Sequence, residues 1–235
     1  MSEQEKKSCV VLVSGGLDSA VTLALAMDRG FAAHGLTVRY GQRHKIETGA
    51  ASRVCKSLKV EEHRFIDLNL RLFGASALTD EMAVPKGPRL PEAEHIPSTY
   101  VPARNTIFLS LALAWAEAIG SHDIFIGVSA IDYSGYPDCR PEFVDAFETM
   151  ANLGTRAADS GEHFNIHAPL IQLTKAKTVQ LGIDLGVDFS LTWSCYDPTP
   201  EGMPCGECES CVLRAGGFTG AGVPDPLLRV SSGVC

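Results

Sequence analysis

The chain has 235 residues, of which 45% are hydrophobic and 20% are charged, and its formal net charge is −8 at pH 7. This composition excludes an intrinsically disordered chain, and the length suits one ordinary domain with a small appendage. The acidic balance argues against a large interface with nucleic-acid phosphates, because such interfaces favour a basic face.

No segment of the sequence predicts a membrane span or a signal peptide. The longest apolar run, residues 107–116, contains Ser110 and is far shorter than the roughly 20 residues that a helix needs to cross a bilayer. Residues 1–8 are polar and lack the apolar stretch of a signal peptide. We therefore expect a soluble protein of the cytoplasm with no membrane contact.

The first part of the chain alternates between strand and helix patterns. Residues 9–13 form a β-branched run that ends at two glycines, and residues 18–29 carry apolar side chains at helical spacing. Residues 32–40 predict a second strand, 45–58 a second helix and 61–68 a third strand. This alternation predicts parallel strands that are joined by crossover helices.

A long segment then interrupts the pattern. Residues 69–102 hold five prolines and two glycines, and a loop of this length is typical of a lid, a binding loop or a disordered segment. The pattern resumes with a helix, a buried strand, a second helix, an extended segment and a last helix, at residues 104–120, 123–128, 142–153, 163–171 and 175–186. The predicted fold is therefore α/β, an open and mainly parallel sheet with helices on both faces.

Half of the eight cysteines crowd together near the C-terminus with the spacing C-x9-C-x2-C-x2-C; they are Cys195, Cys205, Cys208 and Cys211. Two residues between cysteines let consecutive thiolates face one ion, and four thiolates complete a tetrahedral structural zinc site. An iron–sulfur cluster, which also takes four cysteines, is the alternative. We expect one structural Zn²⁺ per chain, bound in a C-terminal segment of residues 193–235 that relies on the metal and lies next to a domain of residues 1–192.

A glycine loop joins the first strand to the first helix. Two glycines let the backbone turn sharply and bring its N–H groups close to an anion, and the helix that follows aims the positive end of its dipole at the same place. The loop is neither a Walker A motif nor a dinucleotide fingerprint, and the alternative is a tight turn without a ligand. The residues expected to bind phosphate are Ser14, Gly15, Gly16, Leu17, Asp18 and Ser19.

The hexapeptide at residues 14–19 resembles the pyrophosphate loop of the N-type ATP pyrophosphatases, which cleave ATP between its α and β phosphates. Residues 40–44 (Tyr-Gly-Gln-Arg-His), 100–105 and 127–140, together with the cysteine spacing, make the chain similar to the 7-cyano-7-deazaguanine synthase family from about residue 9 to residue 226. Two positions depart from the family pattern: Arg39 stands where an acidic residue is usual, and Ser129 stands where Asn is usual.

This resemblance implies a Rossmann-like fold of the adenine-nucleotide α-hydrolase type. It implies a ligase that converts 7-carboxy-7-deazaguanine and ammonia to the nitrile by adenylating the carboxylate and then the amide, with release of AMP and pyrophosphate. ATP would be the co-substrate, Mg²⁺ would accompany it, and the chain would form a homodimer that makes no direct contact with nucleic acid.

The resemblance also implies roles for single residues. The loop would cradle pyrophosphate, Asp18 would help to hold Mg²⁺, and Arg104 and Lys175 would stabilise charge on the α-phosphate. His44 is a candidate acceptor for the proton of the attacking ammonia. The deazaguanine base would meet an acid and aromatic rings in the segment after the fourth strand, where the candidates are Asp132, Tyr133, Ser134, Tyr136 and Asp138.

Two other functions fit parts of the sequence. A tRNA sulfur transferase can pair the same loop with an iron–sulfur cluster, although the acidic charge of this chain argues against that function. A non-catalytic module that only binds ATP would need the loop but no pocket for a second substrate.

Overall fold

The computed structural model describes residues 6–87, 96–129 and 135–230. Five parallel strands form one sheet in the order β3-β2-β1-β4-β5. The strands are β1 (Ser8–Leu12), β2 (Ala32–Arg39), β3 (Glu62–Asp67), β4 (Asp123–Phe125) and β5 (Asn165–His167). The chain proceeds outward from β1 to β3 and then returns to β4 on the other side of β1. Ligands in such sheets bind outside the carboxyl ends of the strands at this reversal.

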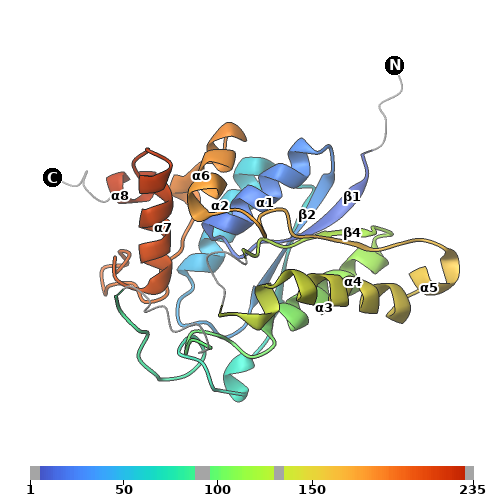
Figure 1. Ribbon diagram of the computed structural model, residues 1–235, viewed down its shortest axis with the longest axis horizontal. Helices are drawn as coiled ribbons and strands as arrows, with labels where there is room; N and C mark the ends of the chain where they lie inside the picture. The colour runs from blue at the N-terminus through green and yellow to red at the C-terminus, as the bar shows by residue number, and fades with distance from the viewer. Residues whose placement is uncertain (1–5, 88–95, 130–134, 231–235) are drawn as a thin grey trace.

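Helices cover both faces of the sheet, as the sequence predicts (Figure 1). One face carries α1 (Leu17–Asp28), α2 (Ile46–Leu58) and α6 (Lys175–Asp184), and the other carries α3 (Arg104–Ala118), α4 (Pro141–Gly154) and the short α5 (Ala157–Ser160). The chain then continues through α7 (Glu209–Gly220) and α8 (Pro226–Val230). Single turns of 3-10 helix lie at η1 (Leu70–Leu72), η2 (Pro137–Cys139) and η3 (Phe189–Leu191).

The central strand β1 supplies both layers of the core. Cys9 and Val11 pack with α1 and α2, whereas Val10 and Leu12 pack with α3. Side chains alternate across a strand, so an unbroken apolar run fits a strand that is buried on both faces. The β-branched run in the sequence therefore marks the middle of the sheet.

Two predicted extended segments are wrong in length. The strand expected at 123–128 ends at Phe125, because the chain next passes against the first turn of α1, where a Cβ at Gly127 would lie 3.1 Å from the backbone of Asp18. The segment expected at 163–171 contains only three strand residues, since Pro169 has no N–H to donate and a turn follows it.

The part of the chain after Trp193 holds a helix that the sequence analysis did not predict. Helix α7 contains Gly216, Gly217 and Gly220, and glycine is a weak helix former, so the sequence pattern hides it. The glycines permit close packing on α6: a Cβ at Gly217 would lie 2.5 Å from Cγ of Lys175. Phe218 of α7 also reaches the core under α1.

The long segment after β3 packs against the cysteine segment where the structure describes it. Its buried members, which join Tyr40, Trp193 and Cys195 in one cluster, are Leu70, Ala77, Leu78, Val84 and Val101. Lys86 forms an ion pair of 2.6 Å with Asp197, and the N–H of Gly87 donates to the carbonyl of Glu207 at 2.8 Å. No helix among the described residues is long and apolar enough to cross a membrane.

Candidate active site

The glycine loop turns from β1 into α1 at the carboxyl edge of the sheet. Gly15 has a φ of +96°, and a Cβ there would lie 2.3 Å from the carbonyl oxygen of Glu47 and 2.5 Å from the backbone nitrogen of Ala51. Both contacts are with backbone atoms, which cannot rotate away, so only glycine lets the loop rest against α2.

The two serines that flank the loop hold its shape. Ser19 Oγ donates to the carbonyl of Gly16 at 3.0 Å and accepts from the N–H of Gly15 at 3.2 Å. Ser14 Oγ accepts from the N–H of Gly16 at 3.1 Å. Hydroxyls and backbone N–H groups therefore gather at the N-terminus of α1, an arrangement suited to a phosphate group.

A cavity of about 190 Å³ lies in front of the loop. Five of the six loop residues line it, all except Gly15, and so do Arg104, Tyr136 and Lys175. The structure thus brings together residues that the sequence analysis predicted from four separate segments. The cavity lies between the ends of β1 and β4, at the reversal of strand order.

Asp18 and Lys175 form an ion pair inside this cavity. The Nζ atom of Lys175 donates to both carboxylate oxygens of Asp18, each at 2.8 Å. Thr174 caps α6 by accepting from the backbone N–H of Lys177. This cap fixes the start of the helix and therefore the position of Lys175, its first residue. The lysine side chain is 7% exposed, so it is part of the cavity wall and not a surface charge.

Arg104 begins α3, directly after Ala103 in the left-handed conformation with a φ of +53°. Its guanidinium donates a hydrogen bond to the hydroxyl of Tyr40. Burial, with the nearby carboxylate of Glu47, raises the pKa of Tyr40 to about 12, although Arg104 opposes the shift. The tyrosine is therefore a neutral partner that orients the arginine at neutral pH.

The base-binding candidates divide into three groups. Asp132, Tyr133 and Ser134 lie outside the described residues. Tyr136 lines the cavity, and its hydroxyl makes a hydrogen bond of 2.6 Å with Oγ1 of Thr99.

Asp138 is buried and is not part of the cavity lining among the described residues. Its Oδ2 atom accepts from the backbone N–H of Asn105 at 3.0 Å, and its carbonyl accepts from Nδ2 of Asn105 at 2.9 Å. The carboxylate thus satisfies a free N–H in the first turn of α3, next to Arg104.

Some residues of the motif at 40–44 anchor the segment after β2, and others line the cavities. Oε1 of Gln42 accepts from the backbone N–H of Tyr40 at 2.8 Å, and Arg43 donates to the carbonyls of Asp80, at 2.8 Å, and Met82. These contacts fix the segment after β2 to the long loop.

His44 does not line the main cavity among the described residues. It lines a second hollow, of about 20 Å³, beside that cavity. The proton acceptor predicted from sequence is therefore separate from the glycine loop.

Sequence reasoning missed several residues of the cavity. Glu47 in the first turn of α2 lines both hollows, and burial raises its pKa to about 7 against the opposing effect of Arg104. Trp193 and Tyr196 come from the segment after η3, where no pattern signals a binding role. One feature of the sequence could have pointed to Glu47. It stands one turn before the buried Ala51 of its helix, and residues four apart lie on the same helix face, so its side chain would be expected to face the protein.

The two departures from the family pattern lie in different places. Arg39 pairs with Asp67 at 3.0 Å at the end of β3 and is not part of the described cavity lining. Ser129 lines the cavity, and its hydroxyl donates to the carbonyl of Leu173 at 3.2 Å.

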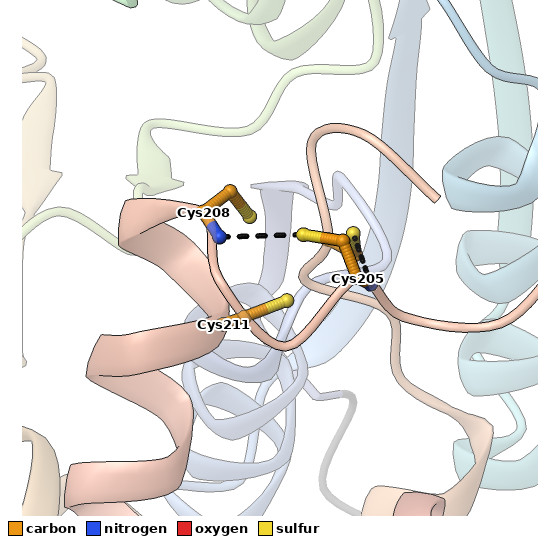
Figure 2. A group of neighbouring side chains, drawn as sticks. Cys205, Cys208 and Cys211 are labelled. Atoms are coloured by element: carbon orange, nitrogen blue, oxygen red, sulfur yellow. Dashed lines mark hydrogen bonds between the residues drawn. The ribbon is translucent and has the colours of Figure 1, made fainter. Parts of the chain in front are cut away.

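The four clustered cysteines can hold a metal ion. Their Sγ atoms all lie within 4.8 Å of one another, and Figure 2 shows the sulfur atoms of Cys205, Cys208 and Cys211 gathered around a common space. Backbone N–H groups donate to these sulfurs, for example from Cys208 to Cys205 at 3.3 Å and from Cys205 to Cys195 at 3.3 Å. Four sulfurs gathered in this way, three of which accept backbone N–H bonds, suit a tetrahedral metal.

The cysteine cluster is joined directly to the glycine loop. The backbone N–H of Trp193 donates to the carbonyl of Gly15 at 2.9 Å, and the indole N–H of Trp193 donates to the carbonyl of Cys195 at 3.0 Å. Trp193 thus links the turn of the loop at Gly15 to Cys195 of the cysteine cluster, and the cluster supports one wall of the cavity.

Comparisons with known proteins give the family. The model of the family described as queuosine biosynthesis protein QueC matches residues 8–222. A protein named 7-cyano-7-deazaguanine synthase from Paramagnetospirillum magneticum is 59% identical over 222 residues, which cover 94% of this chain and 97% of that protein. One of the same name from Desulfatibacillum aliphaticivorans is 58% identical over 229 residues, which cover 96% of this chain and 98% of that protein.

Among solved structures, an NMN synthetase from Francisella tularensis aligns with a TM-score of 0.50 at 18% identity, over 97% of this chain and 84% of that one. At that identity the likeness supports the fold alone. The family match and the two curated relatives span nearly the whole chain. This chain therefore belongs to the family of queuosine biosynthesis protein QueC.

Proposed function

We propose that this chain is an ATP-dependent ligase that converts 7-carboxy-7-deazaguanine and ammonia to 7-cyano-7-deazaguanine. The observation that carries the proposal is the arrangement of the glycine loop, the Asp18–Lys175 pair and Arg104 around one cavity at the reversal of strand order. The names of the curated relatives support the same product.

The first proposed step activates the carboxylate, because oxide is too poor a leaving group for ammonia to displace. A carboxylate oxygen attacks the α-phosphorus of ATP, the bond to the β-phosphate breaks, and pyrophosphate leaves into the loop. The hydroxyls of Ser14 and Ser19 and the loop N–H groups would bind pyrophosphate. Lys175 and Arg104 would stabilise the charge that builds on the α-phosphate.

Asp18 would also hold Mg²⁺ together with the phosphates of ATP, a coordination that this ion favours. The bound ion would neutralise charge on the phosphoryl oxygens. A carboxylate offers about four lone-pair positions, so the two bonds from Lys175 leave Asp18 with further capacity to bind such an ion.

The second half of the reaction uses the same site again. Ammonia attacks the acyl carbon, AMP leaves and a proton is released, which gives the amide. The amide oxygen then attacks the α-phosphorus of a second ATP, and the bond to the β-phosphate breaks with release of a second pyrophosphate. Loss of AMP and of the two remaining N–H protons leaves the nitrile. Tyr136 or Tyr133 would stack on the deazaguanine ring, Asp132 would accept hydrogen bonds from its polar edge with Ser134 nearby in sequence, and Asp138 would act through α3.

The remaining proposals concern the setting of the site. The four cysteines would hold one structural Zn²⁺, because four thiolates leave zinc no open position for catalysis. Residues 193–235 would form this zinc-bound segment on a catalytic domain of residues 1–192. The enzyme would work as a homodimer in the cytoplasm on small molecules, without direct contact with nucleic acid.

The test is a product assay by mass spectrometry with ATP, ammonium and 7-carboxy-7-deazaguanine. We expect AMP together with the nitrile. AMP without nitrile would retain ATP cleavage and overturn the substrate. No nucleotide turnover by metal-loaded protein would favour a module that only binds ATP.

A further inference from the structure

The second hollow beside the main cavity has the size of a very small ligand. Its volume is about 20 Å³, and a space of about 10–15 Å³ is enough for one water molecule. Five residues line both spaces, so the hollow adjoins the place where the substrates would meet: Tyr40, Gln42, Glu47, Trp193 and Tyr196.

One wall of the hollow carries a polar atom that lacks a partner. The Nε2 atom of His44 is buried and forms no hydrogen bond with any described residue. Burying a polar atom without a partner is costly, and such an atom calls for a specific explanation, such as a bound molecule. With its proton on Nδ1, the ring offers Nε2 as an acceptor.

Glu47 adds a second hydrogen-bond acceptor, its carboxylate, to the wall of the hollow. Its carboxyl group lines the hollow and the main cavity and is the one acidic side chain among the described residues that line the hollow. A molecule with several N–H donors and no acceptor satisfies both Glu47 and His44, and ammonium has four such donors whereas water has two. Arg43 also lines the hollow, but its guanidinium donates to the carbonyls of Asp80 and Met82.

We propose that this hollow is a subsite for ammonium, in which the Glu47 carboxylate and Nε2 of His44 accept hydrogen bonds from the ion. The assignment rests on the proposed function, which requires ammonia as a substrate. An ammonium ion is about the size of water, and the tetrahedral set of donors can reach two acceptors and still point toward the main cavity.

The subsite also explains how the nucleophile is released. Ammonium has no free electron pair, so one proton must pass to Glu47 or His44 before the nitrogen attacks. The nitrogen then bonds to the acyl carbon while the carbon–oxygen bond to AMP breaks, and the added nitrogen releases one further proton to solvent to give the amide. Burial raises the pKa of Glu47 to about 7, so its carboxylate accepts a proton more readily than an exposed glutamate does.

The test separates the step that uses ammonia from the step that does not. In Glu47→Gln and His44→Asn, the KM for ammonium in nitrile formation is measured with 7-carboxy-7-deazaguanine. The amide of the same deazaguanine is then supplied, since its conversion to the nitrile needs ATP but no ammonia. We expect the KM for ammonium to rise about 10–100-fold, the equivalent of one hydrogen bond to a charged group, with a much smaller loss in the amide reaction.

The matched controls are Glu61→Gln and His163→Asn, which change exposed residues outside both cavities and should leave both reactions as in the wild type. An unchanged KM for ammonium, or equal losses in the two reactions, would overturn the subsite while the proposed function stands. If the metal-loaded wild type makes nitrile from neither substrate, the proposed function itself fails and the subsite fails with it.

Discussion

Gly15 is held by its own φ and by the backbone of α2. The change Gly15→Ala would place a Cβ 2.3 Å from the carbonyl oxygen of Glu47, at a φ of +96°. We expect the free energy of unfolding to fall by about 2–5 kcal/mol, because left-handed strain costs about 1–2 kcal/mol and overpacking about 1–3 kcal/mol. Urea denaturation measures this loss, and the rate of AMP release should fall with it as the loop shifts.

The control for this prediction is Gly30→Ala. Gly30 has a similar φ of +88°, but a Cβ there would meet nothing within 4 Å. It should therefore cost only the conformational strain, about 1–2 kcal/mol, and leave AMP release unchanged. Equal losses in the two variants would show that the contact with α2 is unimportant.

Glu47 makes stability depend on pH. Burial raises its pKa from about 4.5 to about 7, so the folded protein holds this proton more tightly than the unfolded chain does. Stability is therefore lost as the pH rises from about 4.5 to about 7. Each pKa unit is worth about 1.4 kcal/mol, so Glu47→Gln should exceed the wild type in stability by up to about 3 kcal/mol at pH 8.

The same comparison at pH 4.5 should show little difference, because the wild-type side chain is then protonated in the folded state. Paired urea curves at the two pH values measure the effect, with the exposed Glu61→Gln as the control. A stability difference between Glu47→Gln and the wild type that does not change with pH would contradict the raised pKa.

The sequence alone predicted those site residues that lie within or next to a recognisable motif. Asp18, Arg104 and Lys175 all line the cavity because each lies at the start of a helix that begins at the carboxyl edge of the sheet. It could not predict that Asp138 satisfies the first turn of α3 or that His44 lies in a separate hollow. Those outcomes depend on side-chain directions in loops, which no periodicity fixes.

Among the elements, α6 and α7 approach each other closely at two glycines of α7, Gly217 and Gly220. A Cβ at Gly217 would lie 2.5 Å from Cγ of Lys175 and 3.2 Å from its Cβ. Gly217→Ala should therefore push Lys175 away from Asp18. We expect AMP release to fall by at least about 10-fold, since Lys175 carries the charge that we propose for the transition state and displacing such a charge costs about 1.4 kcal/mol or more.

The neighbouring Gly216 gives a matched control on the same helix, because a Cβ there would meet nothing within 4 Å. Gly216→Ala should raise stability by up to about 1 kcal/mol through helix propensity and leave AMP release unchanged. Thermal denaturation and the AMP assay compare the two variants. A fall in AMP release in both would place the effect in the helix as a whole and not at the contact with Lys175.

The elements that could be predicted from sequence are those with a plain period. The β-branched run predicts β1, and the apolar stripes predict α1 and α2. No such pattern predicts α7, because the glycines that let it approach α6 also lower its helix propensity. Packing on Lys175 and Ala176 decides its conformation, and a sequence pattern does not contain that contact.

At the scale of the whole molecule, the cavity is closed by segments that are far apart in the chain. The loop after β1, the first turns of α2, α3 and α6, and the segment after η3 all contribute to its wall. Trp193 joins the last of these to the glycine loop, and Lys86 joins the long segment after β3 to the cysteine segment through Asp197. Both the thermal stability of the protein and its binding of ATP should therefore depend on the cysteine cluster.

Removal of the metal tests this dependence. Without a metal ion, nothing holds together the four cysteine Sγ atoms that lie within 4.8 Å of one another, and the segment that carries Trp193 and Tyr196 loses its anchor. We expect the melting temperature to fall by at least about 8 °C, since losing even 4 kcal/mol of metal binding costs about 2–4 °C per kcal/mol in a domain of this size. The KM for ATP should rise in the same samples.

Cys205→Ser should reproduce both effects, whereas Cys55→Ala, which changes a buried thiol outside the cluster, should keep the metal and the KM for ATP. Elemental analysis by mass spectrometry identifies the ion, with zinc expected at one per chain and iron as the contrary result. A metal-free protein with an unchanged KM for ATP would show that the cluster stabilises its own segment without shaping the cavity.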